Sequence, residues 1–448
     1  MTSYYSTATV PIHIAIYVAV VLWAYLGGSV SMRHAAIFAA IYFNNIVFEL
    51  GATIRLDYVV CLSAMLLYVG SWRAKRPVEF WWLAAMLTVL LISSIVASVA
   101  PAYSIRKLTI LGIYVIGAAV ILSPAAHRRP MMQVLGEFLA VGNRVLAVSL
   151  IAYLLLITVG LDIGFIKARD QAWLRGPMLN PNTFGSTAST LLILNAAVAL
   201  RSELRASAHA GWTLVAAACV FLSYTRAAWL LALVFGAAIA TWWLWGSGRI
   251  RAVHLALAAT VVVAALSIAP LGSALGFDDK FASLFALSEG TALDRLLIAN
   301  EGIQDWLSNP VFGTGFQTYE LLVGADEDPT VWVPSVMFVQ LLQYGGTGAL
   351  LCFLCFLYVL HRRSLDQLRR AGGWRAGDVL IPLLMCIDLL VVAYQVTSAI
   401  VLAYFWFFAI LLAYLLDERQ LQGDASGQRV LIEAEDSPAV LLQHHASG

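Results

Sequence analysis

Residues 271–334 read LGSALGFDDKFASLFALSEGTALDRLLIANEGIQDWLSNPVFGTGFQTYELLVGADEDPTVWVP and form a long polar interruption in a strongly apolar chain. This stretch holds more acidic residues than any other before the C-terminal tail. A helical run through Trp306 leads into the turn Asn309–Phe316, and a new helix is expected to open near Pro334–Ser335. A membrane protein with this much polar chain outside the bilayer is expected to use it on a substrate.

The composition on both sides of this stretch is that of an integral membrane protein. Of the 448 residues, 61% are hydrophobic and only 12% are charged, whereas soluble domains have about 25% charged residues. A spanning helix needs about 20 mostly apolar residues, and the apolar runs here are too long for barrel strands of about ten residues. The sequence therefore predicts an all-α polytopic membrane protein.

The apolar runs predict about 12 spanning helices, within a range of about 11 to 13. The expected spans lie near residues 9–27, 34–50, 55–71, 79–98, 107–123, 143–160, 181–200, 211–222, 227–245, 253–270, 335–360 and 378–416, the last being long enough for two. This pattern divides the chain into N-terminal spans (1–270), a large partly helical loop (271–334), C-terminal spans (335–416) and a mobile, acidic cytoplasmic tail (417–448).

Lysine and arginine collect on one side of these spans, for example at Arg73–Arg76 and in residues 362–375. By the positive-inside rule this side is cytoplasmic, so the 271–334 loop is expected to face outward together with residues 161–180 and the turn Ser223–Arg226. The net charge of +1 gives no sign of a nucleic-acid partner, and the sequence holds no nucleotide-binding loop and no metal-spaced histidine or carboxylate cluster.

Arginine side chains on the expected outward side are the first candidates for substrate binding or catalysis. Arg226 lies between two apolar runs, where arginine is costly unless it faces a polar cavity or the interface; the alternative is an interfacial arginine whose head reaches water. Arg295 precedes the helical run to Trp306 in the large loop, and its alternative is an ordinary ion pair with Asp294 or Glu301.

The loop at 161–182 carries further cations with few matching acids. Lys167, Arg169 and Arg175 precede the turn signal that contains Asn180 and Asn182. Arginine forms bidentate contacts with phosphate oxygens, so these cations fit an anionic ligand such as a lipid-linked diphosphate. The alternative is a solvated loop. Arginines that stabilise a departing diphosphate need no metal, so neither a metal nor another cofactor is expected.

The acids of the large loop are candidates for a general base that assists an acceptor hydroxyl. The sequence does not rank them against one another, and they are Glu320, Asp326, Glu327 and Asp328. Ser335, at the start of the next expected helix, is a further candidate that would act through water.

Four stretches together resemble the bacterial O-antigen ligase and O-antigen polymerase family of integral-membrane glycosyltransferases. Gly176–Gly185 is similar to a Gly-x-x-x-Asn-Pro-Asn element, and Ser223–Trp229 to a Ser-Arg-Gly-type turn. Arg295–Gly315 is similar to an Arg…Trp…Pro-x-x-Gly-x-Gly element, and Phe338–Gly348 to the helix after the catalytic loop. The resemblance extends over about residues 50–415.

The resemblance implies a GT-C-like helical body in the bacterial inner membrane with its active face in the periplasm. It implies transfer of a glycan from undecaprenyl diphosphate to a sugar hydroxyl of lipid A–core or of another lipid-linked repeat unit. Arg226 and Arg295 then take the two diphosphate-facing roles, and Gly313 and Gly315 belong to the substrate-binding elements. Membrane lipid and, for a polymerase, a chain-length regulator are the further expected partners.

One departure from the family pattern favours a polymerase. Ligases of this family commonly have His-Asn at the start of the helix after the loop, where this chain has Pro334–Ser335, and residues 271–334 contain no histidine. A ligase with a different base remains the alternative. A transporter is the alternative from another class, because Asp388 and Gln395 are polar residues in expected spans, with Glu49 and Asp57 near span ends.

Overall fold

The structure is a computed structural model of the whole chain. It describes residues 10–28, 30–43, 46–49, 53–68, 70, 76–127, 129–159, 166–168, 172–178, 181–201, 206–225, 228–229, 232, 290–322, 336–370, 377–395, 400 and 402–417.

Helices dominate the described residues, as the composition predicts. They are α1 (Val10–Leu26), α2 (Met32–Ala40), α3 (Leu56–Leu67), α4 (Val78–Val96), α5 (Pro101–Ile121), α6 (Pro124–His127), α7 (Met131–Val159), α8 (Pro181–Arg201), α9 (Ala206–Leu222), α13 (Gly290–Ser308), α14 (Thr318–Leu322), α15 (Met337–Arg370) and α16 (Gly377–Gln395), followed by a helix at Ala403–Asp417. Two short antiparallel hairpins pair β1 (Val47–Glu49) with β2 (Thr53–Arg55), and β3 (Ile166–Ala168) with β4 (Ala172–Leu174).

Four helices within the described ranges are long and apolar enough to cross a membrane, and they are Val78–Val96, Pro101–Ile121, Met131–Leu156 and Met337–Gln367. The all-α membrane class is thus confirmed. The count of about 12 spans stays a prediction, because the expected spans at 227–245 and 253–270 lie almost entirely outside the described residues. The division into 1–270, 271–334, 335–416 and 417–448 also stays a prediction.

The expected span at 34–50 is wrong as a continuous helix. Helix α2 ends at Ala40, and Val47 pairs with Arg55 in the first hairpin. Hydrophobicity alone does not separate these structures, since both a helix and a hairpin can bury an apolar run. The Asn44–Asn45 pair in this stretch is a turn signal, so the local turn chemistry, more than the apolar content, indicated the break.

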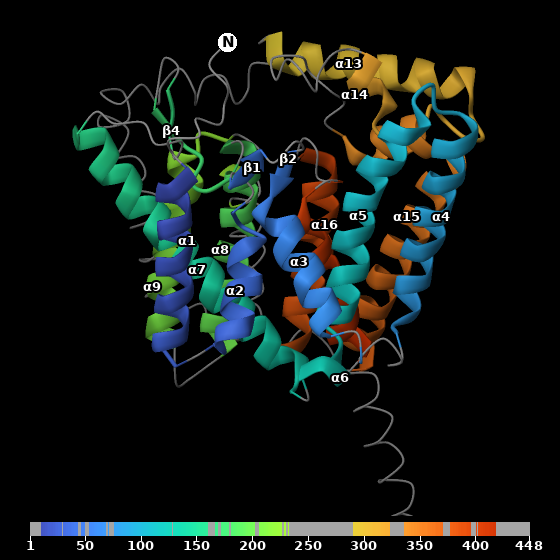
Figure 1. Cartoon of the computed structure of the whole chain (residues 1–448). Coiled ribbons are helices and arrows are strands. Elements are labelled where there is room, and N and C mark those ends of the chain that lie inside the picture. Colours follow the sequence, from blue (N-terminus) through green and yellow to red (C-terminus); the bar gives the residue numbers. More distant parts are fainter. Residues whose placement is uncertain are drawn as a thin grey trace, which may run out of the picture.

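Hairpin β1–β2, strand β4 and helices α13 and α14 all lie at one end of the upright helices, at the top of Figure 1, whereas α6 lies at the bottom. We call the end with α13 the loop end. Helix α13 runs across the tops of its neighbours instead of parallel to them (Figure 1). Helix α16 packs against both α8 and α15, so it joins the α7–α8–α9 group to the α4–α5–α15 group.

Glycines let α4 and α15 approach closely. A Cβ on Gly345 would lie 2.7 Å from a methyl carbon of Leu90, and one on Gly348 would lie 3.3 Å from a methyl carbon of Val89. Small residues at such a contact bring membrane helices within range of tight van der Waals packing. The Gly345 and Gly348 pattern of the sequence therefore marks the α4–α15 interface.

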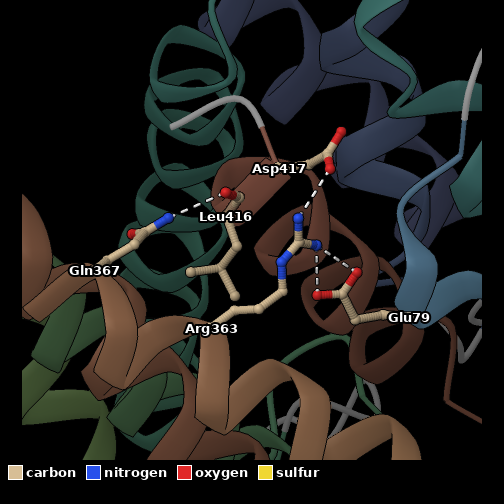
Figure 2. A network of polar contacts seen from close by, with 5 residues as sticks. All are labelled: Glu79, Arg363, Gln367, Leu416 and Asp417. Atoms are coloured by element: carbon tan, nitrogen blue, oxygen red, sulfur yellow. Dashed lines mark hydrogen bonds and ion pairs between the residues drawn. The ribbon is translucent and has the colours of Figure 1, made fainter. Parts of the chain in front are cut away.

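The other end of α15 is fixed by an ion-pair network, which Figure 2 shows. Arg363 Nη1 donates to both carboxylate oxygens of Glu79, at 2.7 and 2.8 Å, and its Nη2 donates to Asp417 Oδ1 at 3.0 Å. Gln367 Nε2 donates to the carbonyl oxygen of Leu416 at 3.0 Å. These contacts join α15 to α4 and to the last helix, so the position of α15 is determined far from the loop end.

Candidate functional site: a glycine turn set into a broken helix

The turn Asn309–Phe316, which we call the glycine turn, lies against a break in α15. Gly346 has φ 66° and ψ −166° inside this helix, a conformation that only glycine adopts readily. Gly313 and Gly315 also have positive φ, of 65° and 91°. A Cβ on Gly313 would overlap the Gln343 carbonyl, and one on Gly346 would overlap the Val311 carbonyl. The two backbones are therefore in direct contact.

The backbone groups released by the break in α15 bond to the glycine turn. In a regular helix the Thr347 amide would donate to the Gln343 carbonyl; here it donates to Pro310 O at 2.9 Å. The Gln343 carbonyl instead accepts the Thr314 amide at 2.7 Å, and the Tyr344 carbonyl accepts the Gly315 amide at 3.1 Å. A broken helix at membrane depth requires such replacement bonds, because lipid offers none.

Serine hydroxyls of α4 and α5 hold the other side of the glycine turn. Ser93 donates to the carbonyls of Phe312 and Tyr344, the latter at 2.6 Å. Ser104 lies 2.8 Å from both Ser94 Oγ and the Phe316 carbonyl, and the Phe316 amide donates to Ser94 Oγ at 3.3 Å. All three serines are fully buried, so these bonds fix the turn within the helix packing.

Helix α13 bonds both to the glycine turn and to α15 beside the break. Gln343 Nε2 donates to Asp305 Oδ2 at 2.7 Å. The Trp306 indole nitrogen lies 3.1 Å from Pro310 O and 3.2 Å from Thr347 Oγ1. The contacts come from the C-terminal half of α13, so this half is held against the break in α15.

Within the described residues, the Glu301 carboxylate bonds to a tyrosine. Its Oε2 accepts a hydrogen bond from the Tyr319 hydroxyl of α14 at 3.0 Å. Burial, and then this bond to a carboxylate, raise the pKa of Tyr319 to about 12, so its phenol donates at neutral pH. The backbone of α13 at Arg295 is described but its side chain is not, so its pairing with Asp294 or Glu301 stays untested.

A second cluster at the loop end joins two elements that are far apart in the sequence. Thr225 Oγ1 donates to the Pro181 carbonyl at 2.9 Å and lies 3.4 Å from Asn182 Oδ1. A Cβ on Gly185 would lie 2.5 Å from Ser223 Oγ. We call this cluster the Asn182 corner. It places the turn after α9 directly on the first turn of α8.

The turn at the Asn182 corner is tightly constrained. Tyr224 has φ 51°, which is uncommon for a residue with a Cβ. The Trp229 ring stacks on Phe221 with centroids 5.4 Å apart, and its indole nitrogen donates to Val220 O at 3.0 Å. Thr225 is therefore held in place next to the start of α8.

The structure describes only some of the predicted site residues. Arg175 lies next to Gly176, which has φ 54°, and the Arg175 carbonyl accepts the Met178 amide at 3.2 Å. The backbone is described, without the side chain, for Lys167 in β3 and Glu320 in α14. The predicted residues outside the described ones are Arg169, Asn180, Arg226, Asp326, Glu327, Asp328 and Ser335.

The acids considered for a transporter have partners within the fold. Asp57 is fully buried and accepts bonds from Arg55 Nη2 and the Tyr114 hydroxyl, both at 2.6 Å. Asp388 is 1% exposed and accepts the Thr190 hydroxyl at 2.5 Å. The side chains of Glu49 and Gln395 are outside the described set. Asp57 and Asp388 are thus both parts of side-chain clusters between helices.

Sequence reasoning missed the residues that hold the glycine turn. Ser93 and Ser94 lie in an apolar run, Ser104 lies between two expected spans, and Gln343 lies in the helix after the loop. Adjacent serines inside a spanning segment are a usable signal, because hydroxyls in membranes bond to neighbouring helices. Which backbone they bond is decided by helix packing and cannot be read from the pattern.

The fold and these clusters define a class: a helical membrane protein in which a glycine-containing turn packs against a broken helix. Residues 212–354 match the family model described as O-antigen ligase. This match supports assignment of the chain to the O-antigen ligase and polymerase family. The matched segment includes position 226, Arg295 and the glycine turn. The stretch Gly176–Gly185, which also resembles the family, lies outside it. No curated protein matches the chain.

Proposed function

We propose that the protein transfers an undecaprenyl-diphosphate-linked oligosaccharide to a sugar hydroxyl on the periplasmic face of the bacterial inner membrane. The observation that carries this proposal is the family match over residues 212–354. One continuous segment of the chain thereby holds Arg226, Arg295 and the glycine turn. The glycine turn bonds to α15 through backbone groups, which gives the loop a rigid base beside the membrane face.

In this proposal Arg226 and Arg295 stabilise the departing diphosphate. Guanidinium groups offer fixed paired donors to phosphate oxygens, and charge that develops on the leaving group is stabilised most where water is excluded. The cations Lys167, Arg169 and Arg175 and the amides of Asn180 and Asn182 would bind the rest of the donor headgroup. The reaction inverts the anomeric centre if the acceptor hydroxyl attacks directly.

An acid of residues 320–328 would accept the proton of the acceptor hydroxyl, or Ser335 would assist that hydroxyl through water. We favour a polymerase, because the position of the family histidine is Pro334 in this chain. The ligase reaction, with lipid A–core as acceptor, is the second candidate, since the matching family model is described as O-antigen ligase.

The test of the diphosphate site uses Arg226→Lys, Arg295→Lys and the double variant in membranes. Lysine keeps the charge but lacks the planar fork, so each variant should lose most transfer, by about tenfold or more. The double variant should be little worse than either one, because both residues serve the same leaving group. Transfer is measured against the amount of folded protein. Near-normal transfer by both single lysine variants would contradict the proposal.

A deletion strain separates the two reactions. Lipid A–core that carries a single repeat unit indicates loss of a polymerase, whereas polymer that accumulates on undecaprenyl diphosphate indicates loss of a ligase. Metal independence belongs to the same proposal: purified protein should retain transfer in excess EDTA. Complete loss that magnesium or manganese restores would contradict the assignment of the electrostatic role to arginines.

A further inference from the structure

The position of helix α13 relative to α15 depends on a small number of polar contacts among the described residues. The helix lies across the helix tops (Figure 1) and ends in the glycine turn. Its residues 297–308 divide into an outward face with exposed Leu297, Glu301 and Leu307, and an inward face with buried Gly302 and half-buried Trp306.

Arg295 is ten residues before Asp305, which is about 15 Å along a rigid helix. The clamp at Asp305 therefore sets the placement of the helix segment that carries Arg295. We propose that the Asp305–Gln343 pair is a positioning device, which fixes α13 on the broken helix so that Arg295 is presented at one place above the membrane face. This inference rests on the proposed function for the role of Arg295, but the clamp itself does not.

The Asp305–Gln343 bond has the features of a specific clamp. It joins residues on two elements at 2.7 Å, and Gln343 is fully buried. Only the amide nitrogen of Gln343 can donate to the carboxylate, so the orientation of this amide is fixed. A hydrogen bond to an ionised group is about twice as strong as a neutral one. The backbone carbonyl of Gln343 accepts the Thr314 amide of the glycine turn. Gln343 of α15 therefore contacts α13 through its side chain and the turn through its backbone.

The neighbouring contacts of α13 do not replace this clamp. The Glu301–Tyr319 bond joins α13 to the short helix α14, which is not part of the upright bundle, and it lies on the exposed face. The Trp306 indole nitrogen contacts Pro310 O in the glycine turn and Thr347 Oγ1 in α15, and both of these acceptors are uncharged. Asp305 therefore supplies the charged member among the contacts that the structure describes between α13 and α15.

The pair is tested by exchanging the carboxylate and the amide between positions 305 and 343. Gln343→Glu sets two carboxylates against each other, so donor transfer at saturating donor should fall about tenfold or more. Asp305→Asn keeps an acceptor for Gln343 and should lower transfer less than about threefold, since a neutral bond remains. In the double variant the new amide at position 305 can donate to the new carboxylate at position 343. It should recover transfer to within about threefold of the wild type.

A readout that needs no activity follows the position of α13. Spin labels at Gln304, exposed on α13, and Leu351, exposed on α15, should give a narrow distance distribution. The distribution should broaden in Gln343→Glu and narrow again in the double variant. Cys352 and Cys355, the partly buried cysteines, are replaced by alanine in this background. Gln304→Glu is the matched control: it adds a charge beside Asp305 on the exposed face and should leave transfer unchanged.

Each outcome decides between the proposals. Restoration of both transfer and the label distance in the double variant supports the clamp. A double variant as defective as Gln343→Glu in both readouts overturns it. Restoration of the distance without transfer also overturns the positioning role, because Gln343, whose buried Oε1 has no partner in the described part of the chain, would then act on the substrate directly. If the label distances respond as expected while Arg226→Lys and Arg295→Lys both keep near-normal transfer, the proposed diphosphate site fails and the clamp stands.

Discussion

Two glycines determine whether the loop can meet the broken helix. Gly313 and Gly346 have φ of 65° and 66°, and each lies where a Cβ would overlap a carbonyl group of the other segment. Both effects act in the same direction: an L-residue is strained at this φ, and its side chain would also force the two backbones apart. The joint between the glycine turn and α15 therefore requires glycine on both sides.

We expect Gly313→Ala and Gly346→Ala to destabilise the protein, each by about 1–3 kcal/mol or more. The measurement is the apparent melting temperature of detergent-solubilised protein, together with transfer in membranes. Gly136→Ala in α7 is the matched control, since a Cβ there meets no atom within 4 Å. This control should be neutral or more stable by about 0.5–1 kcal/mol. Equal melting temperatures for all three variants would contradict the close contact.

Helices α4, α5 and α15 together form the surface against which the glycine turn packs. The break at Gly346 leaves carbonyl groups of α15 without their usual helical partners, and amides of the turn bond to them. Ser93 of α4 bonds from the opposite side to both the turn and α15. A buried backbone carbonyl without a donor costs about 1–3 kcal/mol, so one hydroxyl on a neighbouring helix contributes to the stability of this joint.

Ser93→Ala should therefore destabilise the protein by about 1–3 kcal/mol and lower transfer through loss of the ordered turn. Thr109→Ala on α5 is the control, because its exposed hydroxyl bonds only within its own helix, to the Ile105 carbonyl at 2.8 Å. The control should change the free energy of unfolding by less than about 0.5 kcal/mol. Limited proteolysis within residues 309–316 measures the effect on the turn. Equal protection of the two variants would argue against a role for Ser93.

The whole molecule presents two different ends to its surroundings. The loop end carries α13, α14 and the first hairpin (Figure 1), while the opposite end has the Arg363–Glu79–Asp417 network of Figure 2. Arginines lie in the last turns of α15 at this opposite end, among them Arg362, Arg363 and Arg369. The positive-inside rule predicts that the opposite end faces the cytoplasm and the loop end the periplasm, as the proposed function requires.

Cysteine labelling tests this orientation. Gln304→Cys on α13 should react with an impermeant maleimide in intact spheroplasts, whereas Arg369→Cys near the end of α15 should react only after lysis. Both positions are exposed, so accessibility within the fold does not limit either reaction. The native cysteines are buried or half-buried and serve as the background, measured in the unsubstituted protein. A reversed labelling pattern would contradict the orientation and the periplasmic reaction proposed for the loop.

The sequence by itself determined the membrane class, most helix positions and the glycine turn, because apolar runs, turn residues and glycine spacing act locally. It did not decide that Val47–Glu49 pairs with Thr53–Arg55 as strands, because an apolar run fits either a helix or a strand. Only the tertiary structure brought Thr225 onto the start of α8 and joined Asp305 to Gln343. Each contact joins distant segments and depends on how helices pack, and a buried backbone group takes whichever donor that packing places beside it.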